Sequence, residues 1–289
     1  MRITRVGFGA WAVGGADWSF GWGPQDDDDS VAAIRAALEC GVNWIDTAAA
    51  YGLGHSEEVV RRALADIPEA DRPFVFTKCG IVWEGSGRDA VIRHVAEPAG
   101  IRGECEASLR RLGIERLDLL QLHWPPDDGL PVEEYWPTFL ELKAEGKIRA
   151  AGLSNHAADV LERAEALGHV DSLQPPFSAI HREAAAEELP WCARHGTGVI
   201  VYSPMQAGLL TGTFSEERLQ GLDPGDWRRL SDDFQGDALR RNLALADALR
   251  PIAGRQGVSV AAVAVAWTLA SEGVTGAIVG ARTPAQVDG

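Results

Sequence analysis

Eight short β-rich runs alternate with helical patterns along the chain, and this alternation restricts the fold more than any other feature. The runs lie at residues 3–9, 43–48, 74–78, 117–123, 148–155, 172–176, 198–204 and 276–280. Several helical segments between them begin with Ser, Asp or Glu and end at Gly, as capped helices do. Because strands that alternate with helices pair in parallel and are covered by those helices, the pattern predicts a (β/α)8 TIM barrel.

Length and composition favour one domain that binds a small molecule. The 289 residues are 46% hydrophobic, and no change of composition marks a linker, so we expect a single barrel domain over residues 1–289. The net charge of -15 disfavours nucleic acid and anionic membranes as partners. The run of acids at residues 26–29 is interpreted as a helix start that the helix dipole stabilises.

Other classes of protein find little support in the sequence. The four cysteines form no CxxC pair and the seven histidines form no HxH pair, so we expect no disulfide framework and no metal site. The longest apolar stretch, residues 258–270, is shorter than the roughly 20 residues that span a membrane. No basic, apolar leader precedes the first run. We therefore expect a cytoplasmic protein.

Four ionisable residues lie at or just after the carboxyl ends of three successive runs. Asp46 is near the end of the second run, Tyr51 follows in the next loop, Lys78 ends the third and His123 ends the fourth. Each alone has an ordinary explanation, such as a turn cap or a core histidine. Because active sites of barrels gather at the carboxyl ends of the strands, the four side chains are predicted to converge.

Motifs in a fixed order give the chain a resemblance to the aldo-keto reductases. They are "GFGAWAVGG", "GVNWIDTAAAYGLGHSEEVVRRAL", "FVFTK", "LDLLQLHWP", "GKIRAAGLSN", "YSPMQAGLLTG" and "IVGARTPAQ". The resemblance covers nearly the whole chain and is nearest to the bacterial and plant-type branch of general aldehyde reductases. It implies NADP(H)-dependent reduction of aldehydes or ketones, with Asp46, Tyr51, Lys78 and His123 as the catalytic tetrad.

The chemistry of carbonyl reduction explains these residue types. The carbonyl carbon needs a hydride and its oxygen needs a proton, and a phenol with a pKa of about 10 is a poor acid at neutral pH. We expect the Lys78 ammonium to lower the pKa of Tyr51, and Asp46 to hold Lys78 charged and in place. His123 would donate to the substrate oxygen or orient it.

The resemblance also assigns residues to the cofactor. Those implied to contact the nicotinamide are Ser154, Asn155, Gln174 and Tyr202. Those implied to follow the pyrophosphate are Ser203, Met205, Gly208 and Leu210. Those implied to bind the adenosine end with its 2′-phosphate are Gly280, Arg282 and Gln286. Because a guanidinium suits both a phosphate and an adenine face, NADPH is expected rather than NADH.

Tryptophans are candidates for the substrate pocket. Trp11 and Trp124 match aromatic pocket positions of the family, and an aromatic lining would favour apolar aldehydes. Trp18, Trp22 and Trp83 lie in neighbouring loops. The segment from residue 206 to 235 could fold over the cofactor as a lid or form a surface insertion.

The chain departs from the family pattern at both ends. It starts two residues before the first run, where relatives carry a hairpin, and it stops at Gly289, where they continue with a helix. The predicted barrel would then lack the N-terminal hairpin and the C-terminal helix. Loss of the hairpin would expose apolar residues at the barrel floor.

Two alternatives stay open at this point. Gly7, Gly9 and Ala12 fit the G-x-G-x-x-A pattern of a Rossmann dehydrogenase, although that pattern should open a helix and here enters a loop rich in Gly. In a different class, the same barrel serves as a cofactor-binding regulatory subunit of potassium channels. Fold alone does not decide between an enzyme and such a subunit.

Overall fold

Eight parallel strands close into a barrel in the computed structural model, which describes residues 1–288. Their order around the barrel is β1-β10-β9-β8-β7-β6-β3-β2. The strands are β1 (Val6–Gly9), β2 (Trp44–Asp46), β3 (Phe74–Cys79), β6 (Leu117–Leu122), β7 (Ile148–Ser154), β8 (Ser172–Gln174), β9 (Gly198–Val201) and β10 (Gly276–Gly280). The prediction of a (β/α)8 barrel is confirmed, and the Rossmann alternative, which needs an open sheet, is wrong.

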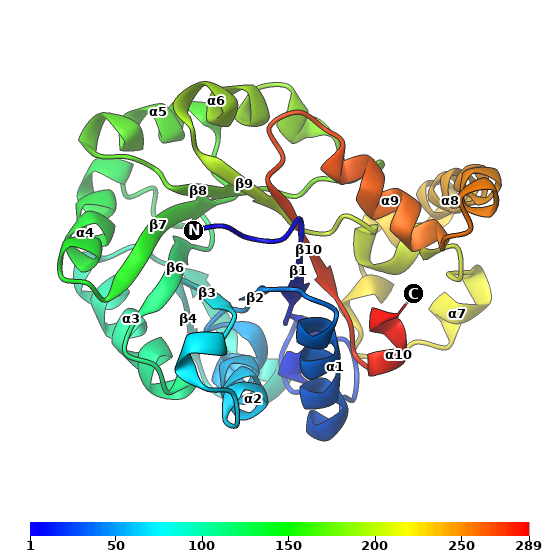
Figure 1. Cartoon of the computed structure of the whole chain (residues 1–289), viewed down its shortest axis with the longest axis horizontal. Helices are drawn as coiled ribbons and strands as arrows, with labels where there is room; N and C mark the ends of the chain where they lie inside the picture. The colour runs from blue at the N-terminus through cyan, green and yellow to red at the C-terminus, as the bar shows by residue number, and fades with distance from the viewer. Residues whose placement is uncertain (289) are drawn as a thin grey trace.

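Helices surround the barrel on its outside (Figure 1). They are α1 (Asp27–Glu39), α2 (His55–Leu64), α3 (Pro98–Leu112), α4 (Val132–Ala144), α5 (Ala158–Leu167), α6 (Glu188–His195), α7 (Glu216–Gln220), α8 (Gly236–Gln256), α9 (Val260–Leu269) and α10 (Pro284–Val287). The run of acids does start a helix, because the Asp26 side chain accepts hydrogen bonds from the N–H groups of Asp28 and Asp29. Over residues 1–288 no single helix is long and apolar enough to cross a membrane; α8 and α9 would suffice only as a pair, and they are bent by 95°.

Several strands are shorter than the sequence predicted. β1 starts at Val6 instead of residue 3, and β9 ends at Val201 instead of residue 204. After β8 the chain contains Pro175 and Pro176, which lack the N–H that a ladder needs, and only an isolated bridge joins Pro176 to Tyr202. The residues after the carboxyl ends of β8 and β9, which were predicted as strand, form loops at the barrel mouth instead.

An antiparallel hairpin, which the sequence analysis missed, follows β3. It consists of β4 (Ile81–Glu84) and β5 (Val91–His94), and it contains Trp83. Two short apolar runs separated by a Gly-containing turn carry the signal that could have found it. Its turn reaches neighbouring loops, since the Arg88 side chain donates to the Ala16 carbonyl and to Asp223.

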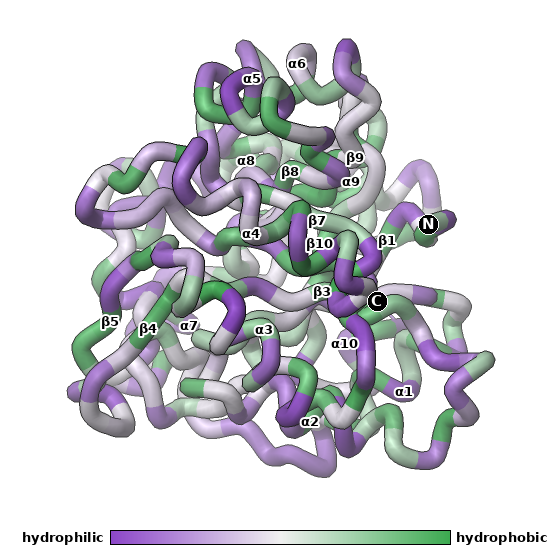
Figure 2. The backbone as a smooth tube through the Cα atoms, turned by 90° about the vertical axis from the view of Figure 1, so that its left-hand side faces the viewer, coloured by the Kyte–Doolittle hydropathy of each residue, from purple (hydrophilic) through white to green (hydrophobic). Residues whose placement is uncertain are grey.

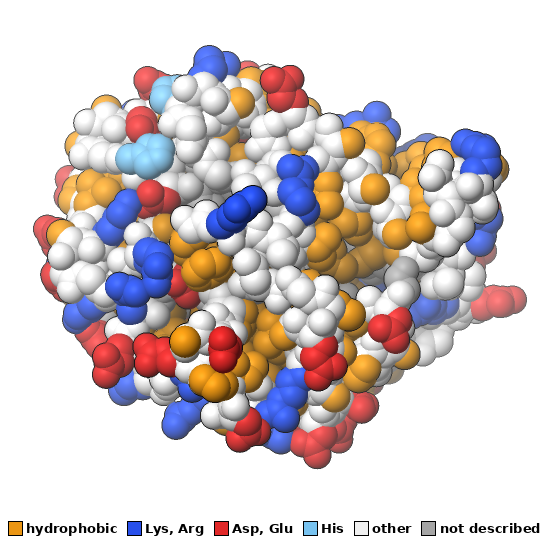
Figure 3. Space-filling model, in the orientation of Figure 1, with side chains coloured by type: hydrophobic (Ala, Val, Ile, Leu, Met, Phe, Trp, Pro, Cys, Tyr) orange, Lys and Arg blue, Asp and Glu red, His pale blue; other side chains and the backbone are white. Residues whose placement is uncertain are grey.

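The barrel interior is filled with large apolar side chains. Trp44, Phe76, Leu119, Ile200 and Ile278 form one buried cluster. Figure 2 shows hydrophobic backbone at β8 and β10. At the floor, Trp44 is fully buried, packs against Ile3 and donates its indole N–H to the Thr4 carbonyl at 2.9 Å. The expectation that apolar residues at the barrel floor are exposed is therefore wrong for Trp44. Hydrophobic side chains do line a hollow between β10 and α9, visible in Figure 3.

Candidate active site

The structure brings the four predicted catalytic residues together at the carboxyl ends of β2, β3 and β6. Asp46 is the last residue of β2, Lys78 lies near the end of β3, and His123 directly follows β6. These strands are neighbours in the barrel order. The backbone joins them further, since the His123 N–H donates to the Cys79 carbonyl at 2.9 Å.

Lys78 is the centre of the cluster. Its Nζ lies 2.5 Å from Asp46 Oδ1, 3.0 Å from the Thr47 carbonyl and 3.3 Å from Tyr51 Oη. The rings of Tyr51 and His123 meet edge to face, with centroids 5.6 Å apart. Asp46, Lys78 and His123 are buried, while Tyr51 keeps part of its surface exposed. Tyr51 is therefore the least buried residue of the four.

Burial and the ion pair set the charge states of Lys78 and Asp46. Burial lowers the pKa of the Lys78 ammonium, and the adjacent Asp46 carboxylate opposes that shift. Burial raises the pKa of Asp46, which accepts hydrogen bonds from Lys78 and, at 2.9 Å, from Gln174 Nε2. Because both carboxylate oxygens have donors, the charged pair is the arrangement that fits these contacts.

The net effect on Tyr51 is opposite to the one predicted from the sequence. Burial raises the pKa of the Tyr51 phenol well above its usual range, and Asp46 raises it further. Desolvation of the phenolate is the larger cause, and Asp46 compensates the charge of the neighbouring Lys78. Tyr51 therefore stays protonated, which is the form that a proton donor requires.

His123 is a neutral imidazole at neutral pH. Burial lowers the pKa of His123 well below its usual range, and the charge of Lys78 lowers it further. A neutral imidazole can donate from one ring nitrogen and accept at the other. It can therefore polarise a carbonyl oxygen without adding a second positive charge beside Lys78.

A tight turn presents Tyr51. Gly52, Leu53 and Gly54 follow it with φ values of 60°, 55° and 103°. A Cβ on Gly52 would lie 1.9 Å from the Gly14 carbonyl oxygen, so only glycine fits where the turn meets the loop after β1. The sequence "YGLG" is therefore a structural requirement for the position of the phenol.

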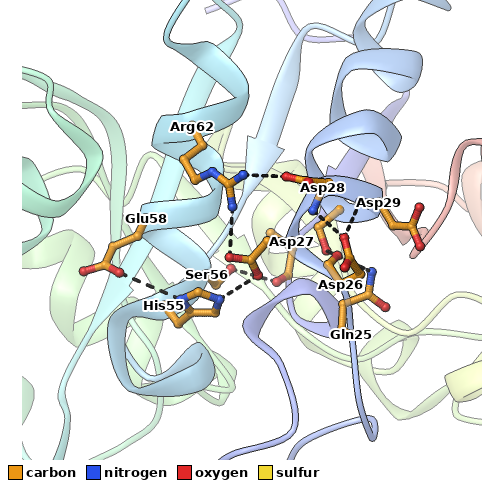
Figure 4. A network of polar contacts seen from close by, with 11 residues as sticks. Gln25, Asp26, Asp27, Asp28, Asp29, His55, Ser56, Glu58 and Arg62 are labelled. Atoms are coloured by element: carbon orange, nitrogen blue, oxygen red, sulfur yellow. Dashed lines mark hydrogen bonds and ion pairs between the residues drawn. The ribbon is translucent and has the colours of Figure 1, made fainter.

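Helix α2 begins at the end of this turn and is fixed to α1 by ion pairs, as Figure 4 shows. His55 Nε2 lies 2.8 Å from Asp27 Oδ1, and Arg62 Nη1 lies 3.0 Å from the other oxygen of the same carboxylate. His55 is the first residue of α2. These contacts tie the start of α1 to the helix that carries the tyrosine turn.

Aromatic rings surround the exposed side of Tyr51. Trp11 stacks on it with centroids 6.1 Å apart, and Trp18 lies at 6.0 Å. Trp227 also stacks on Trp11, with centroids 5.2 Å apart, and Trp22 meets Trp11 edge to face at 5.4 Å. Trp227 belongs to the segment 206–235, which therefore packs against the mouth of the barrel.

Trp124 has a different environment. It is 39% exposed, and its ring contact is with His94 of the hairpin, at 5.9 Å. The sequence analysis predicted both Trp11 and Trp124 as pocket residues. Of these two, Trp11 contacts the tetrad, whereas Trp124 lies at the rim beside His123.

The residues predicted to contact the nicotinamide lie beside the tetrad. Tyr202 Oη donates to Asn155 Oδ1 at 2.8 Å, and Asn155 Nδ2 donates to the His123 carbonyl at 3.0 Å. The Ser154 hydroxyl donates to the Gln174 carbonyl at 2.9 Å. The bond from Gln174 to Asp46 was not foreseen, because nothing in the sequence shows that two residues 128 positions apart meet.

Several loops at the barrel mouth have strained backbone. Among residues 1–288 the non-glycine residues with positive φ are Leu53, Asn155, Ser203, Gln206 and Ala207. All of them follow the carboxyl end of a barrel strand. Such conformations cost about 1–3 kcal/mol each and gather at functional sites.

The predicted pyrophosphate residues are bonded to one another in this conformation. The N–H groups of Gly208 and Leu210 donate to the Met205 carbonyl at 3.2 and 3.0 Å. The Leu210 side chain is buried in a core with Ala179 and Ala246. Phosphate binding through these two amides would therefore require the loop to change.

Arg282 is held by the loop that follows β1. Its Nε donates to Gln25 Oε1 at 2.6 Å, and its terminal nitrogens donate to the carbonyls of Trp22 and Pro24. Gln286 Oε1 accepts from the Arg282 N–H at 2.7 Å, and Gly280 ends β10 two residues earlier. Because the acceptors of its guanidinium are neutral, the positive charge of Arg282 has no direct carboxylate partner among residues 1–288.

A closed parallel barrel with a tyrosine, a histidine and a buried Lys–Asp pair at its mouth is the arrangement expected of a barrel oxidoreductase. Residues 5–289 match the Aldo/keto reductase family, and the chain belongs to this family. Its members reduce carbonyl compounds with a nicotinamide cofactor. The membership agrees with the order of motifs in the sequence.

Individual relatives support the same assignment. The chain is 36% identical to the NADH-specific methylglyoxal reductase of Escherichia coli (strain K12), over 99% of this chain and 88% of the relative. It is also 36% identical to the aldo-keto reductase YhdN of Bacillus subtilis (strain 168), over 100% of this chain and 84% of the relative.

Solved structures resemble the whole barrel. The glycerol dehydrogenase AKR11B4 from Gluconobacter oxydans matches with a TM-score of 0.89 and 39% identity, covering 99% of this chain and 85% of that one. An aldo/keto reductase from Klebsiella pneumoniae in complex with NADP and acetate matches with a TM-score of 0.70 and 28% identity, covering 99% and 84%.

Proposed function

We propose that this protein reduces small aldehydes or ketones to alcohols with NADPH, and that Tyr51 is the proton donor. The observation that carries the proposal is the position of Lys78 Nζ, 2.5 Å from Asp46 and 3.3 Å from the Tyr51 hydroxyl. Tyr51 is the least buried member of this group, and its phenol is protonated. The arrangement fits a proton donor whose conjugate base is stabilised by a fixed ammonium.

Each member of the tetrad has a distinct part in the proposed reaction. Tyr51 gives its proton to the carbonyl oxygen as negative charge develops there. Lys78 then stabilises the remaining phenolate, and Asp46 keeps Lys78 charged and oriented. Neutral His123 donates to the same oxygen or orients it. A reduced nicotinamide, when bound, supplies the hydride to the carbonyl carbon.

The loops after β7, β8 and β9 fit a nicotinamide cofactor. Asn155 and Ser203 have positive φ, a backbone conformation that costs free energy and gathers at ligand-binding sites. Ser154, Asn155, Gln174 and Tyr202 would hold the nicotinamide end. Since Gln174 Nε2 already donates to Asp46, the side-chain oxygen Oε1 of Gln174 is the acceptor proposed for a carboxamide.

The choice of NADPH depends on Arg282 and Gln286. The guanidinium of Arg282 has neutral acceptors, so a 2′-phosphate would be its first anionic partner. Relatives differ in this respect, since the Escherichia coli relative is named NADH-specific and the Klebsiella pneumoniae relative was solved with NADP. The proposal therefore rests on this chain's own residues. No observation favours the channel-subunit alternative.

The direct test is the oxidation of reduced cofactor in the presence of carbonyl compounds. Aromatic aldehydes, aliphatic aldehydes, ketones and sugars would each be assayed with NADPH and with NADH. We expect the highest kcat/KM with apolar aldehydes and NADPH, because Trp11 and Trp18 line the approach to Tyr51. Failure to oxidise NADPH with every carbonyl would contradict the proposed activity, and a preference for NADH would contradict the cofactor assignment alone.

A further inference from the structure

Two carboxylates lie behind the strand that carries Lys78, on the helices that cover it; Glu57 is fully buried and Glu104 is partly buried. Glu57 belongs to α2, and its side chain is completely buried. It accepts from the Thr77 hydroxyl at 2.6 Å through one oxygen and from Arg111 Nε at 2.5 Å through the other. Thr77 directly precedes Lys78, so Glu57 holds the strand on one side of the lysine.

Glu104 of α3 holds the strand on the other side. Its Oε2 accepts from the Gly80 N–H at 2.9 Å. Gly80 has φ of 87°, and a Cβ there would lie 2.4 Å from Leu122, so the chain turns sharply at this point. The preceding carbonyl, that of Cys79, accepts from the His123 N–H. The bond to Glu104 therefore fixes the backbone between Lys78 and His123.

Packing alone is a poor explanation for these two residues. A buried carboxylate loses its hydration, and well-packed apolar side chains often serve a core equally well or better. The second oxygen of Glu104 is buried and has no hydrogen-bond partner among the described residues. Such a cost is common where charge or an acceptor is needed for function.

We propose that Glu57 and Glu104 are positioning residues of the active site, which hold Thr77 and Gly80 so that the Lys78 ammonium stays between Asp46 and Tyr51. The inference rests on the proposed function for its kinetic consequences. Neither residue touches the substrate or the tetrad side chains; both act through the strand. Glu57 has a second, electrostatic effect, because its charge raises the pKa of Lys78 against the effect of burial.

Glu57→Gln tests the electrostatic part. The amide oxygen can still accept from Thr77, but the charge is lost. The titratable groups that face Lys78 are Asp46 on β2, Tyr51 in the following turn, His123 after β6 and Glu57 on α2. The substitution removes the charge of one of the two carboxylates among them. We expect the alkaline limb of the kcat profile to move to lower pH by about half a unit or more. Glu58→Gln, the exposed neighbour on α2, should leave the profile unchanged.

This shift can also be measured without turnover. The chain contains three lysines, Lys78, Lys143 and Lys147, so ¹³C-labelled lysine Cε signals can be assigned by substitution. We expect the pKa of Lys78 to fall in Glu57→Gln and to stay constant in Glu58→Gln. Equal titration of Lys78 in the wild type and in Glu57→Gln would overturn the electrostatic part.

Glu104→Ala and Glu104→Gln test the hydrogen bond to Gly80. We expect Glu104→Ala to lower kcat about tenfold or more at saturating cofactor, with the cofactor Kd within about threefold, because misplaced catalytic groups lose rate before binding. Glu104→Gln keeps an acceptor and should recover most of that loss. Glu106→Gln, on the same helix but paired with Lys147 at the surface, is the matched control.

The pH profile gives a readout that a merely structural role would not change. The pKa of Glu104 is raised to about 7, chiefly by burial. The Gly80 N–H and Arg111 lower this pKa, and the charge of Glu57 raises it. Cys79 also faces Glu104 from β3. A charged carboxylate accepts more strongly than a neutral one, so the wild-type kcat should rise with pH through about 7. This step should be absent in Glu104→Gln, whose side chain does not titrate.

The outcomes separate the two proposals. If the wild type reduces no carbonyl, the proposed function fails, while the titration of Lys78 and the hydrogen exchange of the Gly80 amide still test positioning. Faster exchange of that amide in Glu104→Ala supports the hydrogen bond, and unchanged exchange contradicts it. If Glu104→Ala does not fold, the pH profile of Glu104→Gln decides. Full kcat in folded Glu104→Ala, or equal losses in both Glu104 variants, would overturn the inference.

Discussion

The two sides of the barrel mouth are built by different means. On the β2, β3 and β6 side, Asp46 and Lys78 rise from regular strands, and Lys78 contacts Asp46, the Thr47 carbonyl and Tyr51. On the β7, β9 and β10 side, the loops themselves have unusual backbone at Asn155, Ser203, Gln206 and Ala207. The Lys78–Asp46 pair beside the proposed proton donor must be fixed to within a fraction of an ångström, which strands provide. The proposed dinucleotide cofactor is long and flexible, and it needs backbone amides at several points along its length, which loops with such backbone conformations can present.

The largest expected effect lies on the strand side. Tyr51→Phe should lower kcat by about 10³-fold, within the range of general acid catalysis, because it removes the proton and little else. The cofactor Kd should stay within about threefold, since the contacts assigned to the cofactor lie on the other side. Single-turnover assays and fluorescence titration measure both values. Undiminished turnover would break the comparison, because the phenol would then have no part in the chemistry.

Lys78→Met should have the next largest effect. We expect kcat near neutral pH to fall by about 10²-fold, because the Tyr51 phenolate loses the ammonium that stabilises it. The free energy of unfolding should also fall by about 3–5 kcal/mol, since Asp46 is left as a buried charge without its ion-pair partner. Chemical denaturation and steady-state kinetics would measure the two losses.

A second substitution separates the two effects of Lys78. The double variant Lys78→Met with Asp46→Asn removes the lone charge, so it should recover most of the stability and none of the activity. A loss of activity under tenfold in Lys78→Met would indicate that Lys78 is only a structural partner of Asp46.

Arg282→Ala tests the cofactor side. If Arg282 meets the 2′-phosphate, NADPH should bind about 2–3 kcal/mol more weakly, or about 30- to 150-fold, with little change for NADH. The maximal rate with saturating cofactor should persist, because the tetrad is on the other side. Titration of protein fluorescence with each cofactor gives the two values. Equal losses would show that Arg282 acts through the loop of Trp22 and Pro24, and no loss would exclude it from binding.

The smallest expected effect concerns the strained loop after β9. Ser203→Gly should raise the free energy of unfolding by about 0.5–1 kcal/mol, because glycine adopts the φ of 55° without strain. Ser231→Gly is the control, since Ser231 has an ordinary φ of -78° and should become less stable. Thermal unfolding measures both. Equal destabilisation would mean that the loop backbone stores no strain at Ser203.

Much of the strand side could be predicted because it is local in the sequence. Asp46, Lys78 and His123 each lie at the end of a recognisable β-rich run, and Asp26 precedes a helical pattern with a suitable cap. When a β-rich run forms a strand, a charged residue at the end of the run lies at the end of that strand. The resemblance then added the cofactor residues, which periodicity could not supply.

Other features were missed because they join distant segments. The bond from Gln174 to Asp46 and the bond from Glu104 to Gly80 connect different elements. The hairpin after β3 was hidden because its two strands are short and lie outside the barrel repeat. Contacts between elements depend on how the barrel closes, and no sequence spacing encodes that distance.

The sequence by itself determined the order of elements and the kinds of groups at the strand ends, because hydrophobic periodicity and strand direction are properties of the chain. Only the tertiary structure decided the protonation of those groups. The sequence predicted that Asp46 and Lys78 would pair and lower the pKa of Tyr51; they do pair, yet the pKa of Tyr51 rises. The reason is physical: desolvation sums over every atom that surrounds the phenol, including Trp11 and Trp18 from the loop after β1, and that sum exists only once the chain has folded.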